Sequence, residues 1–216
     1  INIVGMRLED AIKLIKGPEG TVVDLTVRKV DGTIETVSIT RDVVELEESY
    51  AKSATIDAGE NKYGLINLPK FYIDFEDYAE RNAATDVAKE LERLKEAGAE
   101  GIILDLRDNG GGSLKTVVDM AGLFIKDGPI VQVRSSGQRK EVHEDKDERI
   151  QWDGPLVILV NELSASASEI LAAAMQDYKR AVIIGSKQTF GKGTVQNIFP
   201  LDDIVRGNEH GDLGDI

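Results

Sequence analysis

Three serines stand where an apolar strand passes into a helix, and this junction constrains the chain more than any other stretch. Residues 155–160 are apolar and predict a buried strand, and residues 170–178, rich in Ala, predict a helix. Ser164, Ser166 and Ser168 lie between them. The first backbone N–H groups of a helix have no partner within the helix and carry partial positive charge. The serines therefore meet a group of donors that needs either a cap or a ligand.

Two interpretations of this junction are open. A serine hydroxyl at a helix start can act as a nucleophile beside donors that would stabilise a developing oxyanion. Alternatively, Ser166 and Glu169 match a capping box, in which the two side chains satisfy the helix N–H groups. Serine is common at helix starts, so capping is the more frequent explanation for such a stretch considered alone.

Composition excludes several classes of function. The net charge is −13 and no basic cluster is present, which argues against nucleic acid and anionic membranes as partners. The chain has no Cys, so thiol catalysis and cysteine metal sites are excluded. No apolar run approaches the roughly 20 residues that span a bilayer, and no signal peptide opens the chain. Because Ile1 starts within an apolar segment without a preceding Met, we expect a fragment of a longer protein.

The chain is expected to contain two units and a connector. In residues 1–42, a helix over 6–15 precedes two strands, 22–30 and 33–40, which Asp31-Gly32 joins as a hairpin. Residues 43–61 are expected to be a connector, since 43–53 are strongly acidic. Residues 62–216 form the second unit, which we expect to be truncated at its C-terminal end.

The second unit alternates between predicted strands and helices. This alternation predicts an α/β fold with a mixed, partly parallel sheet. The charged run 141–149 is expected to be a solvated loop or a hairpin. The strands at 101–106 and 181–184 are expected to be buried. The predicted strands are 62–68, 101–106, 130–133, 156–160, 181–184 and 194–199, and the predicted helices are 85–97, 114–125 and 170–178.

A glycine-rich loop, residues 107–113, follows the strand at 101–106. Its three successive glycines allow backbone N–H groups to face a site without obstruction by side chains. A surface turn, a phosphate cradle and an oxyanion hole are the three alternatives, although no phosphate-binding glycine motif is present. Loops at the carboxyl ends of parallel strands lie at the same edge of a sheet. The glycine loop and the serine loop would then be neighbours.

A nucleophilic serine needs a base. His143 lies in the charged run and His210 in the polar tail, so a Ser-His-Asp triad is poorly supported. Lys192 lies between two glycines, after one predicted strand and before the last. A lysine accepts a proton only in its uncharged form, which burial away from carboxylates favours. The alternative for Lys192 is an ordinary solvated loop lysine.

Taken together, these stretches resemble a known family, the C-terminal processing, or tail-specific, serine peptidases. The resemblance covers about residues 63–196, including Asn109-Gly110-Gly111-Gly112, the serine stretch 164–170 and Phe190-Gly191-Lys192-Gly193-Thr194. The serine and lysine motifs, in this order, are highly specific. Residues 3–40 are similar to the C-terminal half of the PDZ domain that such peptidases carry.

The resemblance implies a role for each matching residue. Ser166 would be the nucleophile and Lys192 the base, with Gln196 supporting the lysine and Asp177 implicated as well. The backbone N–H groups of Gly112 and Ala167 would be the oxyanion donors. The implied fold is a crotonase-like α/β peptidase core, and no cofactor or metal is implied.

The expected function is a serine endopeptidase that cleaves unfolded or flexible proteins, recognised by apolar C-termini, through an acyl-enzyme. The implied location is extracytoplasmic in a bacterium, periplasmic or membrane-associated, and a homo-oligomer is left open. The alternative function is a catalytically silent module that binds protein C-termini. Two departures from the family pattern concern the substrate groove: the PDZ half lacks its carboxylate-binding loop, and the chain ends soon after Ile204.

Overall fold

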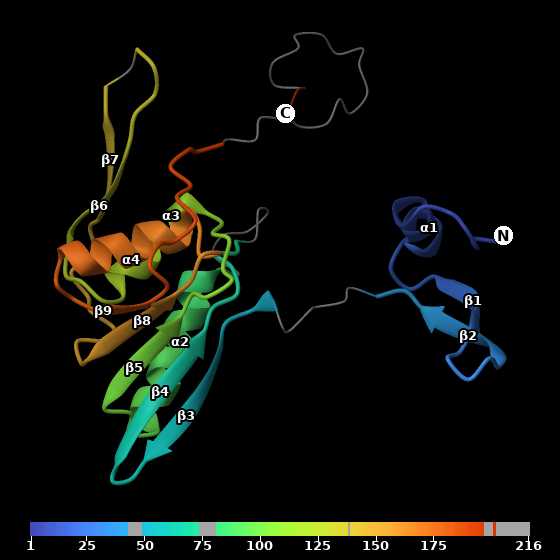
Figure 1. The fold of residues 1–216 in the computed structure, drawn as a ribbon, viewed down its shortest axis with the longest axis horizontal. Coiled ribbons are helices and arrows are strands. Elements are labelled where there is room, and N and C mark those ends of the chain that lie inside the picture. The colour runs from blue at the N-terminus through green and yellow to red at the C-terminus, as the bar shows by residue number, and fades with distance from the viewer. Residues whose placement is uncertain (43–48, 74–80, 138, 197–200, 202–216) are drawn as a thin grey trace. The chain divides into compact units, whose positions relative to one another are not determined.

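The computed structural model describes residues 1–42, 49–73, 81–137, 139–196 and 201 (Figure 1). The chain divides into two compact units, Ile1–Glu47 and Glu48–Ile216, which are described separately.

The first unit consists of α1 (Leu8–Ile15) and a hairpin of β1 (Val22–Arg28) and β2 (Ile34–Thr40). The hairpin turn forms at the predicted place, because the Asp31 carboxylate accepts hydrogen bonds from the Thr33 N–H and hydroxyl. Arg41 ties the elements together: its Nε donates to the Ile15 carbonyl at 2.8 Å and its Nη1 to the Thr21 hydroxyl at 2.8 Å. Among the described residues of this unit only Ala11 is buried, so the unit has almost no core of its own.

The second unit is built on a five-stranded sheet with the order β3-β4-β5-β8-β9 (Figure 1). The strand β3 is antiparallel to β4, and β4, β5, β8 and β9 are mutually parallel, which confirms the predicted mixed, partly parallel sheet. The strands are β3 (Lys52–Ala58), β4 (Asn61–Asn67), β5 (Gly101–Asp105), β8 (Leu156–Val160) and β9 (Val182–Gly185).

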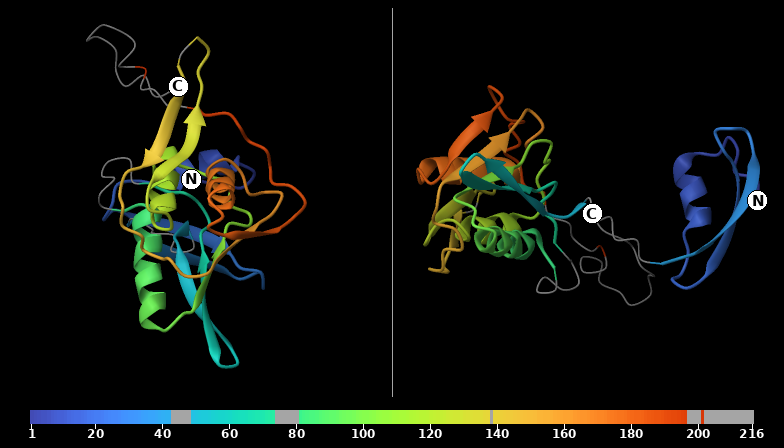
Figure 2. Two further views of the ribbon diagram at one scale, coloured as in Figure 1. Left: turned by 90° about the vertical axis from the view of Figure 1, so that its left-hand side faces the viewer. Right: turned by 90° about the horizontal axis from the view of Figure 1, so that it is seen from below.

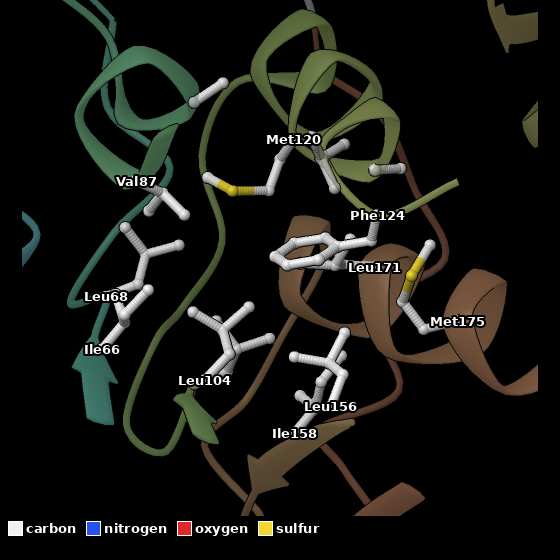
Figure 3. Packing of buried hydrophobic residues seen from close by; sticks show 14 of the residues in the cluster. Ile66, Leu68, Val87, Leu104, Met120, Phe124, Leu156, Ile158, Leu171 and Met175 are labelled. Atoms are coloured by element: carbon white, nitrogen blue, oxygen red, sulfur yellow. The ribbon is translucent and has the colours of Figure 1, made fainter. Parts of the chain in front are cut away.

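The core lies between the sheet and three helices, α2 (Ala83–Glu96), α3 (Leu114–Gly122) and α4 (Ala167–Asp177). Figure 3 shows Leu104 and Ile158 from the strands facing Phe124 and Leu171 from the helical layer. Alternate residues of β8 are buried, as expected for a strand with one covered face. The helices present apolar stripes to that face, which explains why strand and helix alternate in the sequence.

The remaining strands, β6 (Gly128–Val133) and β7 (Glu141–Asp145), form a separate antiparallel hairpin. The hairpin extends away from the sheet and helices, as Figure 1 and the left-hand view of Figure 2 show. Of the two alternatives for the charged run 141–149, the hairpin is therefore the correct one for residues 141–145.

Four expectations about elements need correction. Residues 52–58 are not connector but form β3, an exposed edge strand whose small and polar residues hide its strand pattern. The strand β9 is the opposite edge of the sheet and is largely exposed rather than buried. In β5, which is expected to be buried on both faces, Ile103 is only half-buried. Residues 194–196 form no strand, and the rest of the predicted strand 194–199 lies outside the described residues.

Within the described part of the chain, no helix has the length and apolar character needed to cross a membrane.

Candidate active site

The structure separates the three serines by their surroundings. The Ser164 hydroxyl is fully buried and donates to the Leu106 carbonyl at 2.8 Å. The Ser168 hydroxyl is also fully buried and donates to the Asn109 carbonyl at 2.9 Å. Ser166 is half-buried and lines a cavity of about 350 Å³. Only Ser166 among the three is placed to meet a ligand.

The backbone at Ser166 is unusual. Its φ of 56° and ψ of −113° lie outside the regions that non-glycine residues ordinarily adopt, at the residue that directly precedes α4. Such conformations persist only where the surrounding structure enforces them, and they are concentrated at functional sites. A sharp, strained strand-to-helix turn is also how other hydrolases expose a nucleophilic serine. Here it follows β8 and directs Ser166 toward the cavity.

The glycine loop after β5 packs directly against this turn. A Cβ placed on Gly111 would lie 2.7 Å from the Ser166 Cβ and 2.8 Å from the Ala165 carbonyl oxygen, and the φ of Gly111 is +100°. A Cβ on Gly112, with φ +145°, would lie 2.2 Å from the carbonyl oxygen of Phe71. Only glycine fits at these two positions, so the glycine run is required by close backbone approach and not merely by a turn.

Three N–H groups at this edge make no hydrogen bond with a described residue, those of Gly110, Gly112 and Ala167. By contrast, the Gly111 N–H is occupied, because it donates to the Asn109 side-chain oxygen at 2.9 Å. The expected oxyanion donors are therefore among the N–H groups that remain available beside Ser166.

Asn109 joins the loops and is a site residue to which the sequence assigned no role. It is fully buried, and its Nδ2 donates to the Leu68 carbonyl at 2.8 Å. Its own carbonyl accepts from the Ala165 N–H at 3.0 Å and from the Ser168 hydroxyl. Asn109 thus connects Leu68 and the glycine loop through its side chain, and the serine turn through its backbone carbonyl. In the sequence, the only signal that could have indicated this role is an Asn directly before the glycine run.

Lys192 lines the same cavity as Ser166 and the three glycines 110–112. The predicted nucleophile and base are therefore brought together, although they are 26 positions apart in sequence. The surroundings of Lys192 differ from the expectation: residues 191–196 are exposed rather than enclosed by strands.

Glu169 holds the lysine loop against the serine turn. Its Oε1 accepts from the Thr189 hydroxyl and the Gly191 N–H, both at 2.6 Å. Its Oε2 accepts from the N–H groups of Ser166 and Lys192, both at 2.9 Å. Glu169 thus caps the helix, as the capping-box interpretation expects, and fixes both candidate catalytic residues as well.

The electrostatics of Glu169 follow from these bonds. Burial by itself would raise the pKa of the Glu169 carboxyl, but the four hydrogen bonds favour the charged form and hold the pKa below its ordinary value of 4.5. Glu169 is therefore ionised at neutral pH and acts as a fixed acceptor.

The structure does not bring every predicted site residue to the cavity. Asp177 is the last residue of α4 and is exposed, about 16 Å along the helix from Ser166 at 1.5 Å per residue. Gln196 is exposed and is not among the residues that line the cavity. His143 lies in the β6–β7 hairpin, where its Nε2 is 3.6 Å from Glu141. In the described ranges no group of His, Asp and Glu is arranged to hold a metal ion.

These features define a class: an α/β protein in which a serine on a strained strand-to-helix turn shares a cavity with a glycine loop and a lysine. Comparison with known proteins agrees with this class. Residues 62–209 match the model of peptidase family S41. The chain belongs to peptidase family S41.

The chain is similar to several proteases. A tail-specific protease from Haemophilus influenzae is 46% identical over 94% of this chain and 28% of its own length. A carboxyl-terminal-processing protease from Picosynechococcus is 39% identical over 94% of this chain and 46% of its own length. The solved photosystem II D1 C-terminal processing protease superimposes with a TM-score of 0.61 at 28% identity, over 92% of this chain and 52% of that one. The chain thus spans less than half the length of both curated relatives.

Proposed function

We propose that this chain carries the catalytic core of a serine endopeptidase that cleaves unfolded or flexible proteins recognised by apolar C-termini. The observation that carries the proposal is the cavity shared by Ser166, Lys192 and the glycine loop in a member of family S41. The names of the relatives, tail-specific and carboxyl-terminal-processing protease, support the substrate class.

The proposed reaction passes through an acyl-enzyme. Uncharged Lys192 takes the proton of the Ser166 hydroxyl while Oγ attacks the carbonyl carbon of the scissile peptide bond. The N–H groups of Gly112 and Ala167 stabilise the oxyanion of the tetrahedral intermediate. Lys192 then gives its proton to the departing amine as the peptide C–N bond breaks. In the second half of the reaction, Lys192 takes a proton from water as the water attacks the ester, and it returns that proton to the Ser166 oxygen as the acyl group leaves. Gln196 and Asp177, which do not line the cavity, have supporting roles in this proposal, Gln196 toward Lys192.

Three finer points belong to the same proposal. Residues 1–42 are part of a PDZ-like unit that binds peptide substrates. The protein works in an extracytoplasmic, periplasmic or membrane-associated compartment of a bacterium. No metal or cofactor takes part in the reaction.

The experiment is turnover of an unfolded reporter protein with an apolar C-terminus, compared with the same reporter ending in charged residues. We expect cleavage of the first reporter, insensitivity to chelators, and complete loss in Ser166→Ala. Binding of the apolar C-terminus by the wild-type protein without any cleavage would instead favour the alternative, a silent module that recognises protein C-termini.

A further inference from the structure

A second lysine lines the candidate active-site cavity. We propose that Lys70 determines specificity by binding a carboxylate of the substrate close to the scissile bond, either an Asp or Glu side chain or the terminal α-carboxylate. The inference rests on the proposed peptidase function and names a feature of its substrates.

The backbone around Lys70 is fixed in front of the site. Pro69 and Lys70 both line the cavity with Ser166. On one side of this pair, the Leu68 carbonyl accepts from Asn109 Nδ2 at 2.8 Å. On the other side, the Phe71 N–H donates to the Gly111 carbonyl and the Phe71 carbonyl accepts from the Ser113 N–H, both at 2.9 Å. Lys70 is thus carried by a segment that is hydrogen-bonded to the glycine loop itself.

The side chain of Lys70 is available for a ligand. Lys70 is exposed and makes no ion pair or hydrogen bond with any residue in the described part of the chain. Arg107, which follows β5, differs in this respect, because it is paired with Asp105 at 2.6 Å.

The charge around the cavity points to a carboxylate as the ligand. The described lining contains no Asp or Glu, and its two charged residues are Lys70 and Lys192. Lys192 is uncharged when it acts as the base, which leaves Lys70 as the positive charge of the lining. The ionised Glu169 carboxylate lies beside this lining, but both of its oxygens accept hydrogen bonds from the protein, so Lys70 is the charged group that remains open to a ligand. An acidic group of the substrate would therefore be held here in preference to elsewhere.

Lys70 could instead be the base itself, and the geometry favours Lys192 for that role. The Lys192 N–H and the Ser166 N–H share one acceptor oxygen of Glu169, whereas nothing comparable joins Lys70 to the serine turn. The distinction is testable, because loss of a base removes turnover of every substrate, and loss of a specificity residue changes only the ranking among substrates.

The test has two stages, with wild-type protein and the variants Lys70→Met, Lys70→Glu and Lys95→Met. Lys95 is an exposed lysine of α2 outside the cavity and is the matched control for loss of one charge. First, the cleavage sites of an unfolded reporter protein are mapped by mass spectrometry, which locates the position nearest the scissile bond where acids are enriched. Second, kcat/KM is measured for peptide pairs with Asp or Asn at that position, and for pairs ending in a free carboxylate or an amide at that distance.

We expect wild-type protein and Lys95→Met to prefer the acid over its neutral partner by about two- to fivefold, the range of an exposed ion pair, with a smaller ratio at high salt. In Lys70→Met the ratio falls to one, and in Lys70→Glu it falls below one, while cleavage of the neutral peptides continues. The Asp/Asn pair and the carboxylate/amide pair show which source of the carboxylate Lys70 binds.

An unchanged ratio in both Lys70 variants would overturn the Lys70 inference and leave the proposed function intact. Loss of turnover for the neutral peptides as well would assign Lys70 to the chemistry and also overturn it. If wild-type protein cleaves no peptide and Ser166 is not labelled by a fluorophosphonate, the proposed function fails, and the Lys70 inference fails with it.

Discussion

The side-chain carboxylate of Glu169 accepts a hydrogen bond from the backbone N–H of Lys192 at 2.9 Å. Because the same oxygen accepts from the N–H of Ser166 at 2.9 Å, a single atom sets the spacing of the two residues proposed to carry out catalysis. The helix cap and the catalytic scaffold are therefore one feature, and the two interpretations of the serine junction are not exclusive.

Replacing Glu169 by Gln should impair catalysis through geometry. An amide keeps one acceptor oxygen but turns an NH2 group toward N–H donors, so either the serine turn or the lysine loop loses its anchor. Because small misplacements of reacting groups can lower a rate by about 10²-fold, we expect kcat to fall by one to two orders of magnitude with little change in KM. Glu92→Gln, on the exposed face of α2, is the matched control and should behave as wild type. A normal kcat in Glu169→Gln would show that the hydrogen bonds of the Glu169 carboxylate to Ser166 and Lys192 are not needed for catalysis.

The same residue predicts a dependence of stability on pH. The pKa of Glu169 is lowered in the folded state, so its contribution to stability is present above its unfolded pKa near 4.5 and is lost as the pH falls through the lower folded value. The difference in unfolding free energy between wild type and Glu169→Gln should therefore be constant near neutral pH and shrink below pH 4.5. Denaturant titrations of both proteins, from neutral pH to below pH 4.5, measure this difference in unfolding free energy. A difference that grows on acidification would contradict the assignment.

The serines should separate stability from activity. Ser164→Ala and Ser168→Ala each remove a buried hydrogen bond to a carbonyl, which typically costs about 1–3 kcal/mol of unfolding free energy. Ser166→Ala should leave stability nearly unchanged and abolish turnover. Denaturant unfolding of the three variants measures the loss of stability, and peptide turnover measures the loss of activity. Normal turnover by Ser166→Ala would remove it as the nucleophile.

The glycine loop offers a matched pair of substitutions. Gly111→Ala places a Cβ against Ser166 and Ala165 at a φ of +100°, whereas a Cβ on Gly110 has nothing within 4 Å. We expect Gly111→Ala to lose both stability and the rate at which Ser166 reacts with a fluorophosphonate, and Gly110→Ala to keep both. Equal behaviour of the two variants would show that the loop does not pack against the serine turn as described.

Much of the fold could be predicted from the sequence, because the covered face of the sheet imposes a periodic pattern on strands and helices. The strand β8 is a continuous apolar run and the helix α4 is rich in apolar residues, and both form close to the predicted bounds. Edge strands lack this constraint. The strand β3 buries almost nothing, so its residues predict a connector, and the apolar residues of β9 predict a buried strand although it forms an exposed edge.

The site was predictable to the extent that its residues belong to recognisable motifs. Ser166, Lys192 and the glycine run are grouped in one cavity as expected. The residues that position them were not assigned that role, because Asn109 and Glu169 act through hydrogen bonds to backbone groups far away in sequence. Such bonds leave no periodic signal, and only the three-dimensional arrangement reveals them.

The most direct test of the account is the rate at which a fluorophosphonate modifies the protein, with the modified residue located by mass spectrometry. We predict a single adduct on Ser166 in the wild-type protein. In Lys192→Met and Lys192→Arg, which provide no base, the rate should fall by about 10²–10⁴-fold while the melting temperature is unchanged. An adduct on Ser164 or Ser168, or an unchanged rate in folded Lys192 variants, would contradict the proposed Ser-Lys pair.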